Sequence, residues 1–323
     1  MSASAILPTP AEVRAAAARI AERVRRTPLV RSEGMSAFLG GDVWLKLECE
    51  QETCSFKLRG ATNVLAQLDD LARAAGVVAS SAGNHGLGIA SAAAAIGIRA
   101  TVFVPRTAPA VKREKIAALG ATVDATAATY DDAEQLARTH AAEIGATFVS
   151  PCTGRALLAG QGTVALEVLE ELPTLGTIVV SVGGGGLVGG VGGLLRGDAP
   201  LVRIVGVQSE RTNAMALALS SGMPANPPDL PTLADGLTGL VDAEMLAQGQ
   251  AAIDAMVTVR EADIASAIAW LWMEESVKAE GAGAAGVAAL LAGQVGELVF
   301  PAVVIVSGGN IDDAVHRGVL AAS

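Results

Sequence analysis

Lys57 is the residue whose type and position first suggest covalent chemistry. It lies in "TCSFKLRGATNVLAQL", which begins at Thr53, and Ser55 is predicted to cap a helix in whose first turn Lys57 falls. A helix N-terminus carries a partial positive charge, so an ammonium ion is disfavoured there and a neutral amine is more easily obtained. A neutral amine attacks carbonyl carbons and forms Schiff bases. Most lysines are solvated surface charges, and this motif alone leaves that alternative open.

A run of four glycines, Gly183–Gly186, suggests a second chemical group. It lies in "TIVVSVGGGGLVGGVGGLL", which spans Thr177–Leu195 and begins with an apolar stretch. A strand that ends in consecutive glycines and leads into a helix can wrap its backbone N–H groups around an anion, and phosphate is the commonest such ligand. A tight turn would need only one or two glycines. The run therefore predicts a phosphate site.

The same run leaves open which phosphate is bound. Gly184, Gly186 and Gly189 satisfy the dinucleotide pattern G-x-G-x-x-G, and Glu210 lies about 20 residues further on, where a ribose-binding acid is expected. No G-K-[ST] follows, which excludes a P-loop. Dinucleotide and other phosphates remain alternatives on this motif alone.

The elements that must position these groups alternate between strand-like and helix-like segments. Short Val/Ile-rich runs such as "GVVASSA", "RATVFVP", "TIVVSV", "VRIVGVQ" and "AVVIVSGG" are separated by Ala-rich helical stretches. This alternation predicts an α/β fold whose mainly parallel, twisted sheets are covered by helices and form two lobes. We expect residues 1–47 and 147–323 to form a large cofactor-binding domain. We expect residues 48–146 to form a small domain that closes over the substrate.

Composition narrows the class of protein. Hydrophobic residues make up 51% of the 323 residues and charged ones 17%, which excludes a disordered chain. The net charge of −10 disfavours nucleic acid and anionic membranes as partners. Three cysteines without a C-x-x-C pair argue against a disulfide framework or structural zinc.

Neither a membrane span nor a secretory signal is predicted. The segment from Glu171 to Arg196 has no charge between its ends, but eight glycines between Gly183 and Gly193 disfavour a membrane helix. The Met1–Pro10 segment has no basic region and no long apolar region, so we expect a cytoplasmic protein.

Five motifs in order resemble one known family. They are "SFKLRGA", "SSAGNHG", "AGQGT", "GGGGL" and "VSGGNID", and together they resemble the threonine dehydratase and serine racemase family. The resemblance runs from Thr27 to the end of the chain. Members are pyridoxal 5'-phosphate enzymes of fold type II, with a tryptophan synthase β-like architecture. The resemblance implies that the glycine run holds the cofactor's single phosphate and that the dinucleotide match is coincidental.

Carried over residue by residue, the resemblance implies a role for each motif. Lys57 resembles the lysine that binds the cofactor as a Schiff base and, once freed by the substrate, takes the Cα proton. The other cofactor contacts that it implies are Phe56 on the pyridine ring, Asn84 at the phenolic oxygen, Ser307 facing the pyridine nitrogen, and Gly183, Gly184, Gly185, Gly186 and Leu187 around the phosphate. The substrate carboxylate is implied to contact Ser81, Gly83, Asn84 and His85.

Three of these side chains have structural alternatives. Asn84 and Ser307 can each be a simple helix cap. His85 can be a packed loop histidine that offers the carboxylate only its backbone N–H.

The resemblance implies an ammonia-lyase that removes the hydroxyl of a β-hydroxy amino acid and yields a 2-oxo acid and ammonia. A hydroxyl partner such as Ser307 would not hold a proton on the ring nitrogen, which favours prompt loss of the β-substituent over transamination. Cysteine synthase-like β-replacement and racemisation remain alternatives on the same fold. An oxidoreductase that uses the dinucleotide pattern and a catalytically silent cofactor-binding protein are further alternatives. The resemblance also implies a homodimer.

Departures from the family pattern refine these expectations. Ala82 stands where the racemases carry a second serine, the base on the opposite face, so two-base racemisation is disfavoured. Gln208 and Ala214 occupy positions where members with a divalent cation carry acids, so no metal site is expected.

Each of three further residues has two possible roles. Cys54 replaces the usual glycine before "SFK", and is either reactive or a small packed residue. Arg155 either meets a second substrate carboxylate or lies on the surface. Glu280 either faces the cofactor ring or caps a helix.

Overall fold

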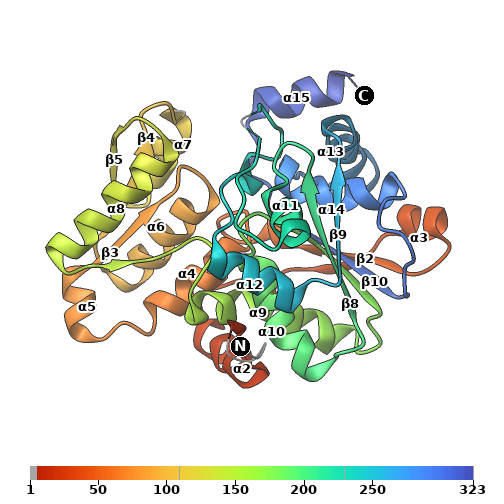
Figure 1. Cartoon of the computed structure of the whole chain (residues 1–323), viewed down its shortest axis with the longest axis horizontal. Helices are drawn as coiled ribbons and strands as arrows, with labels where there is room; N and C mark the ends of the chain where they lie inside the picture. Colours follow the sequence, from red (N-terminus) through yellow and green to blue (C-terminus); the bar gives the residue numbers. More distant parts are fainter. Residues whose placement is uncertain (1–5, 109, 229, 323) are drawn as a thin grey trace.

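Two separate sheets organise the chain. The computed structural model describes residues 6–108, 110–228 and 230–322, so the first five residues of the segment assessed as a signal lie outside them. Figure 1 shows a smaller lobe, coloured orange to yellow, beside a larger one that contains the amino-terminal helix and the carboxyl-terminal half. The predicted fold class is confirmed.

The larger lobe is built on six strands in the order β1-β2-β10-β7-β8-β9. Their bounds are β1 (Leu29–Arg31), β2 (Val43–Leu47), β7 (Thr177–Ser181), β8 (Arg203–Ser209), β9 (Ala255–Val259) and β10 (Ala302–Val306). β1 runs antiparallel to β2, and the other pairings described in this sheet are parallel. Every residue of β7 and β10 is buried, as expected for apolar strands covered on both faces.

Helices cover both faces of the larger sheet. Its helical segments are α2 (Pro10–Ile20), α3 (Glu33–Leu39), η1 (Glu48–Glu50), α9 (Arg155–Glu171), α10 (Gly186–Asp198), α11 (Ala214–Ser221), η2 (Asp235–Leu237), α12 (Ala243–Ala252), α13 (Glu261–Glu275), α14 (Gly281–Leu291) and α15 (Asp313–Ala322). One apolar core joins the sheet to α13 and α14, and another joins it to α9, α10 and α12.

The smaller lobe has a four-stranded parallel sheet in the order β5-β4-β3-β6. Its elements are α4 (Lys57–Leu65), α5 (Asp70–Ala75), β3 (Val77–Ser80), α6 (Asn84–Ile96), β4 (Ala100–Pro105), α7 (Ala110–Ala118), β5 (Thr122–Ala127), α8 (Tyr130–Ile144) and β6 (Thr147–Phe148). Helices α4, α6 and α7 pack on one face, and α8 packs on the other.

The sheets depart from the predicted domain division at one point. β6 pairs with β3 in the smaller sheet, so residues 147 and 148 lie with the smaller lobe and not, as predicted, with the larger one. A strand of this length buries too little apolar surface to predict its partner. The rest of the division into residues 1–47 with 147–323, and 48–146, stays a prediction.

A buried ionic cluster joins the start of α4 to the larger lobe. Arg59 is fully buried and its Nε lies 2.8 Å from Oε2 of Glu48, while its Nη1 lies 2.6 Å from Oε1 of Glu167 on α9. Lys46 Nζ completes the cluster, 2.6 Å from the second oxygen of Glu167. Two positive and two negative charges balance, which is the condition for keeping them out of water. Lys57 therefore begins a helix that is anchored two residues further on.

Across the described residues, every helix is too short or too polar to cross a lipid bilayer.

Candidate active site

A cavity of about 750 Å³ lies between the two lobes and is lined by residues of both. The carboxyl ends of three strands open onto it: β3 leads into Ser81, β7 into Gly183 and β10 into Ser307. Ligands of α/β proteins bind at this edge of a sheet because the loops that follow the strands converge there. The sequence motifs thus meet in one place although they lie far apart in the chain.

The four glycines form a cup at the start of α10. Gly185 has a φ of +91°, a conformation that favours glycine, and it precedes the first helical residue, Gly186. An added Cβ on Gly184 would lie 2.7 Å from Sγ of Cys152. The first N–H groups of a helix have no partner inside it and carry a partial positive charge. The cup therefore suits an anion that approaches the backbone closely.

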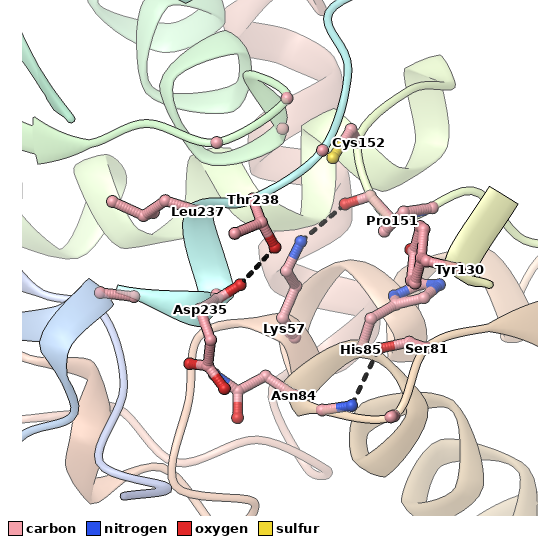
Figure 2. Close-up of a pocket in the computed structure, with 18 of the residues that line it drawn as sticks. Lys57, Ser81, Asn84, His85, Tyr130, Pro151, Cys152, Asp235, Leu237 and Thr238 are labelled. Carbon is pink, nitrogen blue, oxygen red and sulfur yellow. Dashed lines mark hydrogen bonds between the residues drawn. The ribbon is translucent and has the colours of Figure 1, made fainter. Parts of the chain in front are cut away.

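Lys57 lines the same cavity. Its Nζ donates a 2.8 Å hydrogen bond to the carbonyl oxygen of Pro151 and lies 5.1 Å from the centre of the Phe56 ring. Figure 2 shows the lysine pointing toward Pro151, with Cys152 beside that proline. The side chain is half-buried, so the alternative of a freely solvated lysine is excluded.

The helix that begins with Lys57 is capped differently from the prediction. Phe56 is the N-cap residue of α4, and its own side chain makes no capping bond. The hydroxyl of Ser55 has no hydrogen-bond partner among the described residues, so the predicted Ser55 cap is wrong. Ser55 is instead held through its backbone in a β-bridge with Gly308, which places the helix start one residue later.

Asn84 is the first residue of α6 and not its cap, because Gly83 occupies the cap position. Its Nδ2 donates to Oε1 of Glu280 at 2.6 Å, and its Oδ1 accepts from Nδ2 of Asn310 at 2.7 Å. Glu280 is buried at the N-cap position of α14, where its side chain makes no capping bond. Burial, and then the charge of Asp235, raises its pKa from 4.5 to about 7.

His85 is a buried, neutral histidine. Its Nε2 lies 2.9 Å from the carbonyl oxygen of Val149, which can only accept, so this nitrogen carries the proton. Burial, and then the charge of Lys57, lowers the pKa of His85 from 6.5 to about 3. A neutral ring cannot attract a carboxylate by its charge. The structure therefore favours the packed-histidine alternative, with only the backbone available to a substrate.

Ser81 and Ser307 both line the cavity. The hydroxyl of Ser81 accepts from the backbone N–H of Gly83 at 3.2 Å, which shapes the turn before α6. Ser307 is buried directly after β10, six residues before α15 begins, so it is not a helix cap. Its carbonyl accepts from the N–H of Phe56 at 3.1 Å and ties the lysine segment to the central strand.

Several residues that line the cavity were not predicted. They are Tyr130, Pro151, Cys152, Asp235, Thr238 and Asn310. Pro151 and Cys152 begin the stretch "PCTGRALLAGQGT", which ends in the "AGQGT" motif, and Asn310 lies within "VSGGNID", so those two motifs were the available signal. Asp235, which begins η2, and Thr238, which follows it, carry no such signal.

Two residues with open interpretations lie outside the cavity lining. Arg155 forms an exposed ion pair with Glu12 of α2, so the interpretation as a contact for a second substrate carboxylate is wrong. Cys54 is exposed with a φ of +55°, so the interpretation as a packed residue is also wrong.

Acidic, cysteine and histidine side chains do not cluster in threes at metal-binding distance anywhere in the described residues. Gln208 stands at one of the positions expected to carry an acid in family members with a divalent cation. Its Oε1 accepts a hydrogen bond from the backbone N–H of Ala216 at 3.0 Å.

An anion cup and a nearby amine together suit a cofactor that carries both a phosphate and a carbonyl group. The two helix-covered sheets are the architecture of pyridoxal phosphate enzymes of fold type II, and the chain shares this fold with solved structures of a serine racemase and a threonine deaminase. The chain belongs to the family of pyridoxal-phosphate dependent enzymes, whose model matches residues 20–308. The dinucleotide alternative is thereby excluded.

Similar proteins of known name narrow the class of enzyme within this family. An L-threonine ammonia-lyase of Thermotoga maritima is 42% identical over 293 residues, which cover 90% of this chain and 72% of the relative. A putative threonine dehydratase of Sinorhizobium fredii is 40% identical and covers 94% and 92% of the two chains. The solved structure of maize serine racemase superposes with a TM-score of 0.91 at 32% identity, covering 98% of each chain. The predicted family, cofactor and ammonia-lyase class are confirmed.

Proposed function

We propose that this enzyme converts a small β-hydroxy amino acid such as threonine or serine into a 2-oxo acid and ammonia. The observation that carries the proposal is the position of Lys57, whose amine lies in the same cavity as the glycine cup. Relatives named for threonine ammonia-lyase activity support the same substrate class.

Separate groups of residues would hold the phosphate and the ring of the cofactor. The glycine cup, Gly183–Gly186, would hold the cofactor's phosphate, with Leu187 and Phe56 as the apolar walls. When bound, pyridoxal phosphate supplies an electron sink that stabilises negative charge at the substrate's Cα. Ser307 would present a neutral hydroxyl to the cofactor ring.

The substrate is bound and deprotonated by two neighbouring groups. The N-terminus of α6, at Ser81–His85, would receive the substrate carboxylate through backbone N–H groups. The amine of Lys57 takes the Cα proton as a general base. Loss of that proton and of the β-hydroxyl, followed by addition of one water, gives a 2-oxo acid and ammonium, so the atoms balance.

The test uses the purified enzyme with threonine, serine and bulkier 3-hydroxy amino acids, and measures release of 2-oxo acid. Lys57→Ala should lower turnover by about 10³-fold or more, and should also remove the visible absorbance that covalent attachment at Lys57 produces. Retention of that absorbance in the variant, or no 2-oxo acid from any substrate with the unaltered enzyme, would contradict the proposal.

Racemisation and β-replacement are less well supported. Ala82 lines the cavity in the place where the racemases carry a second serine, so a base for the opposite face is lacking at that position. Chiral analysis of unreacted substrate should show no inversion, and added thiol should not be incorporated into product.

We further infer a homodimer in the cytoplasm, supported by resemblance alone. Light scattering on the purified protein tests the dimer, and cell fractionation tests the location.

A further inference from the structure

A buried carboxylate adjoins the cavity without a role in the steps above. Glu280 is only 6% exposed, although α14 gives it no capping function. Its Oε1 accepts from Nδ2 of Asn84, and its backbone N–H donates to the carbonyl of Gly308 at 3.1 Å. An added Cβ on Gly308 would collide with Oε1 of Glu280 and would lie 3.1 Å from Nδ2 of Asn84. The contact between the carboxyl and the amide thus depends on a glycine at position 308.

The hydrogen bonds of this cluster have a fixed direction from one end to the other. The carbonyl oxygen of Thr53 can only accept, so the amide group 2.8 Å away must be Nδ2 of Asn310. The same Nδ2 donates to Oδ1 of Asn84, so the Asn84 amide must direct its Nδ2 toward Glu280. A carboxyl keeps one accepting oxygen whether or not it is protonated, so this bond persists in both states.

The direction of these hydrogen bonds determines which hydrogen-bonding group Asn84 can present to the cavity. The Nδ2 group has two hydrogens, and Glu280 takes one of them. Oδ1 accepts from Asn310, which uses one of its two lone pairs. The second hydrogen of Nδ2 is the donor that Asn84 retains for a ligand in the cavity. Without Glu280, the amide would lose the acceptor that holds its nitrogen in place.

We propose that Glu280 is a positioning residue, which fixes the Asn84 amide so that it presents a donor to an oxygen of the bound cofactor. The inference rests on the proposed function, because it takes Asn84 to face the cofactor. It assigns Glu280 a role through Asn84 and no contact with the reacting atoms.

The experiment is a double-mutant cycle on the holoenzyme with Asn84→Ala, Glu280→Ala and the combined variant. We expect Glu280→Ala to shift the visible absorption spectrum of the bound cofactor and to weaken cofactor binding, measured by absorbance titration, about tenfold. If Glu280 acts through Asn84, the combined variant should match Asn84→Ala alone. Glu280→Gln, which retains an accepting oxygen, should restore most of the spectrum.

Two results would overturn the proposal: an unchanged spectrum in Glu280→Ala, or effects of the two single changes that simply add. If Glu280→Ala does not fold, Asn310→Ala removes the other partner of the amide and is expected to shift the spectrum without adding to Asn84→Ala. An unchanged spectrum there would overturn the proposal equally. These readings need only cofactor binding, so they remain informative even if no substrate yields a 2-oxo acid.

Discussion

Cys54 holds a backbone conformation that favours glycine. Its φ is +55°, while its side chain is exposed. A left-handed conformation costs a residue with a Cβ roughly 1–2 kcal/mol, and glycine loses part of that gain through its greater freedom in the unfolded chain. We expect Cys54→Gly to unfold with a free energy about 0.5–1 kcal/mol higher than Cys54→Ala, measured in urea. A glycine variant that is less stable than the alanine variant would contradict this account.

Glu280 couples stability to pH. Its pKa in the folded protein is about 7, raised from 4.5, so between these values the folded chain binds a proton that the unfolded chain has lost. The resulting stabilisation is complete below about pH 4.5 and disappears as the pH rises through 7. The groups that act on this carboxyl are Asp235 and Lys112 through their charges, Nδ2 of Asn84 through its hydrogen bond, and the backbone of Asn310.

We therefore expect the cofactor-free protein to lose about 3 kcal/mol of stability relative to Glu280→Gln between pH 4.5 and 8. Urea unfolding of both proteins at several pH values measures this difference. Parallel pH profiles for the two proteins would show that Glu280 does not titrate in this way.

At the residue scale, the sequence identifies the residues that carry the chemistry but not the contacts that hold them in place. Lys57 and the glycine run stand out because a lysine at a helix start and consecutive glycines are rare patterns with few physical uses. The bond between Asn84 and Glu280 joins residues 196 positions apart, and no local pattern encodes it. For the same reason Ser55 was predicted as a cap, since its β-bridge to Gly308 depends on a strand near the other end of the chain.

Among the elements, α9 and α10 cross at a point where both contribute a glycine. An added Cβ on Gly190 would lie 2.5 Å from the backbone nitrogen of Gly162 and closer still to the carbonyl of Leu158. Backbone atoms cannot move aside, so we expect Gly190→Ala to lower the free energy of unfolding by about 2–3 kcal/mol.

The matched control is Gly318→Ala in α15, where an added Cβ meets nothing within 4 Å. That change should raise stability by roughly 0.5–1 kcal/mol, because alanine has the higher helix propensity. Thermal and urea unfolding of both variants measure the contrast, and equal effects would contradict the proposed close packing.

The buried ionic cluster that anchors α4 leads to a second prediction about a secondary-structure element. Arg59→Met would leave Glu48 and Glu167 without their main partner in a buried position, which typically costs about 3–5 kcal/mol. Arg26 pairs with Glu170 at the surface with about half of its side chain exposed, so Arg26→Met should cost at most about 1 kcal/mol. Urea unfolding compares them, and similar losses in the two variants would count against a structural role for the buried cluster.

For the whole molecule, the pattern of alternating strands and helices predicted the two-lobed α/β architecture. It did not indicate β1, β2 or β9, which complete the larger sheet. β1 has three residues and β9 is half-buried along most of its length, as expected for the two edge strands of the sheet. β2 includes the buried Lys46, which only the ionic cluster makes acceptable there.

The position of β10 has a consequence for synthesis on the ribosome. This strand joins β2 to β7 at the middle of the larger sheet, yet it comprises residues 302–306 of a 323-residue chain. All four strands of the smaller sheet have been translated by residue 148, so that lobe can fold while the nascent chain is still growing. Until β10 emerges, β2 and β7 each keep an unpaired edge, and such edges recruit other chains. Interruption of translation shortly before residue 302 should therefore yield aggregates that contain a folded smaller lobe.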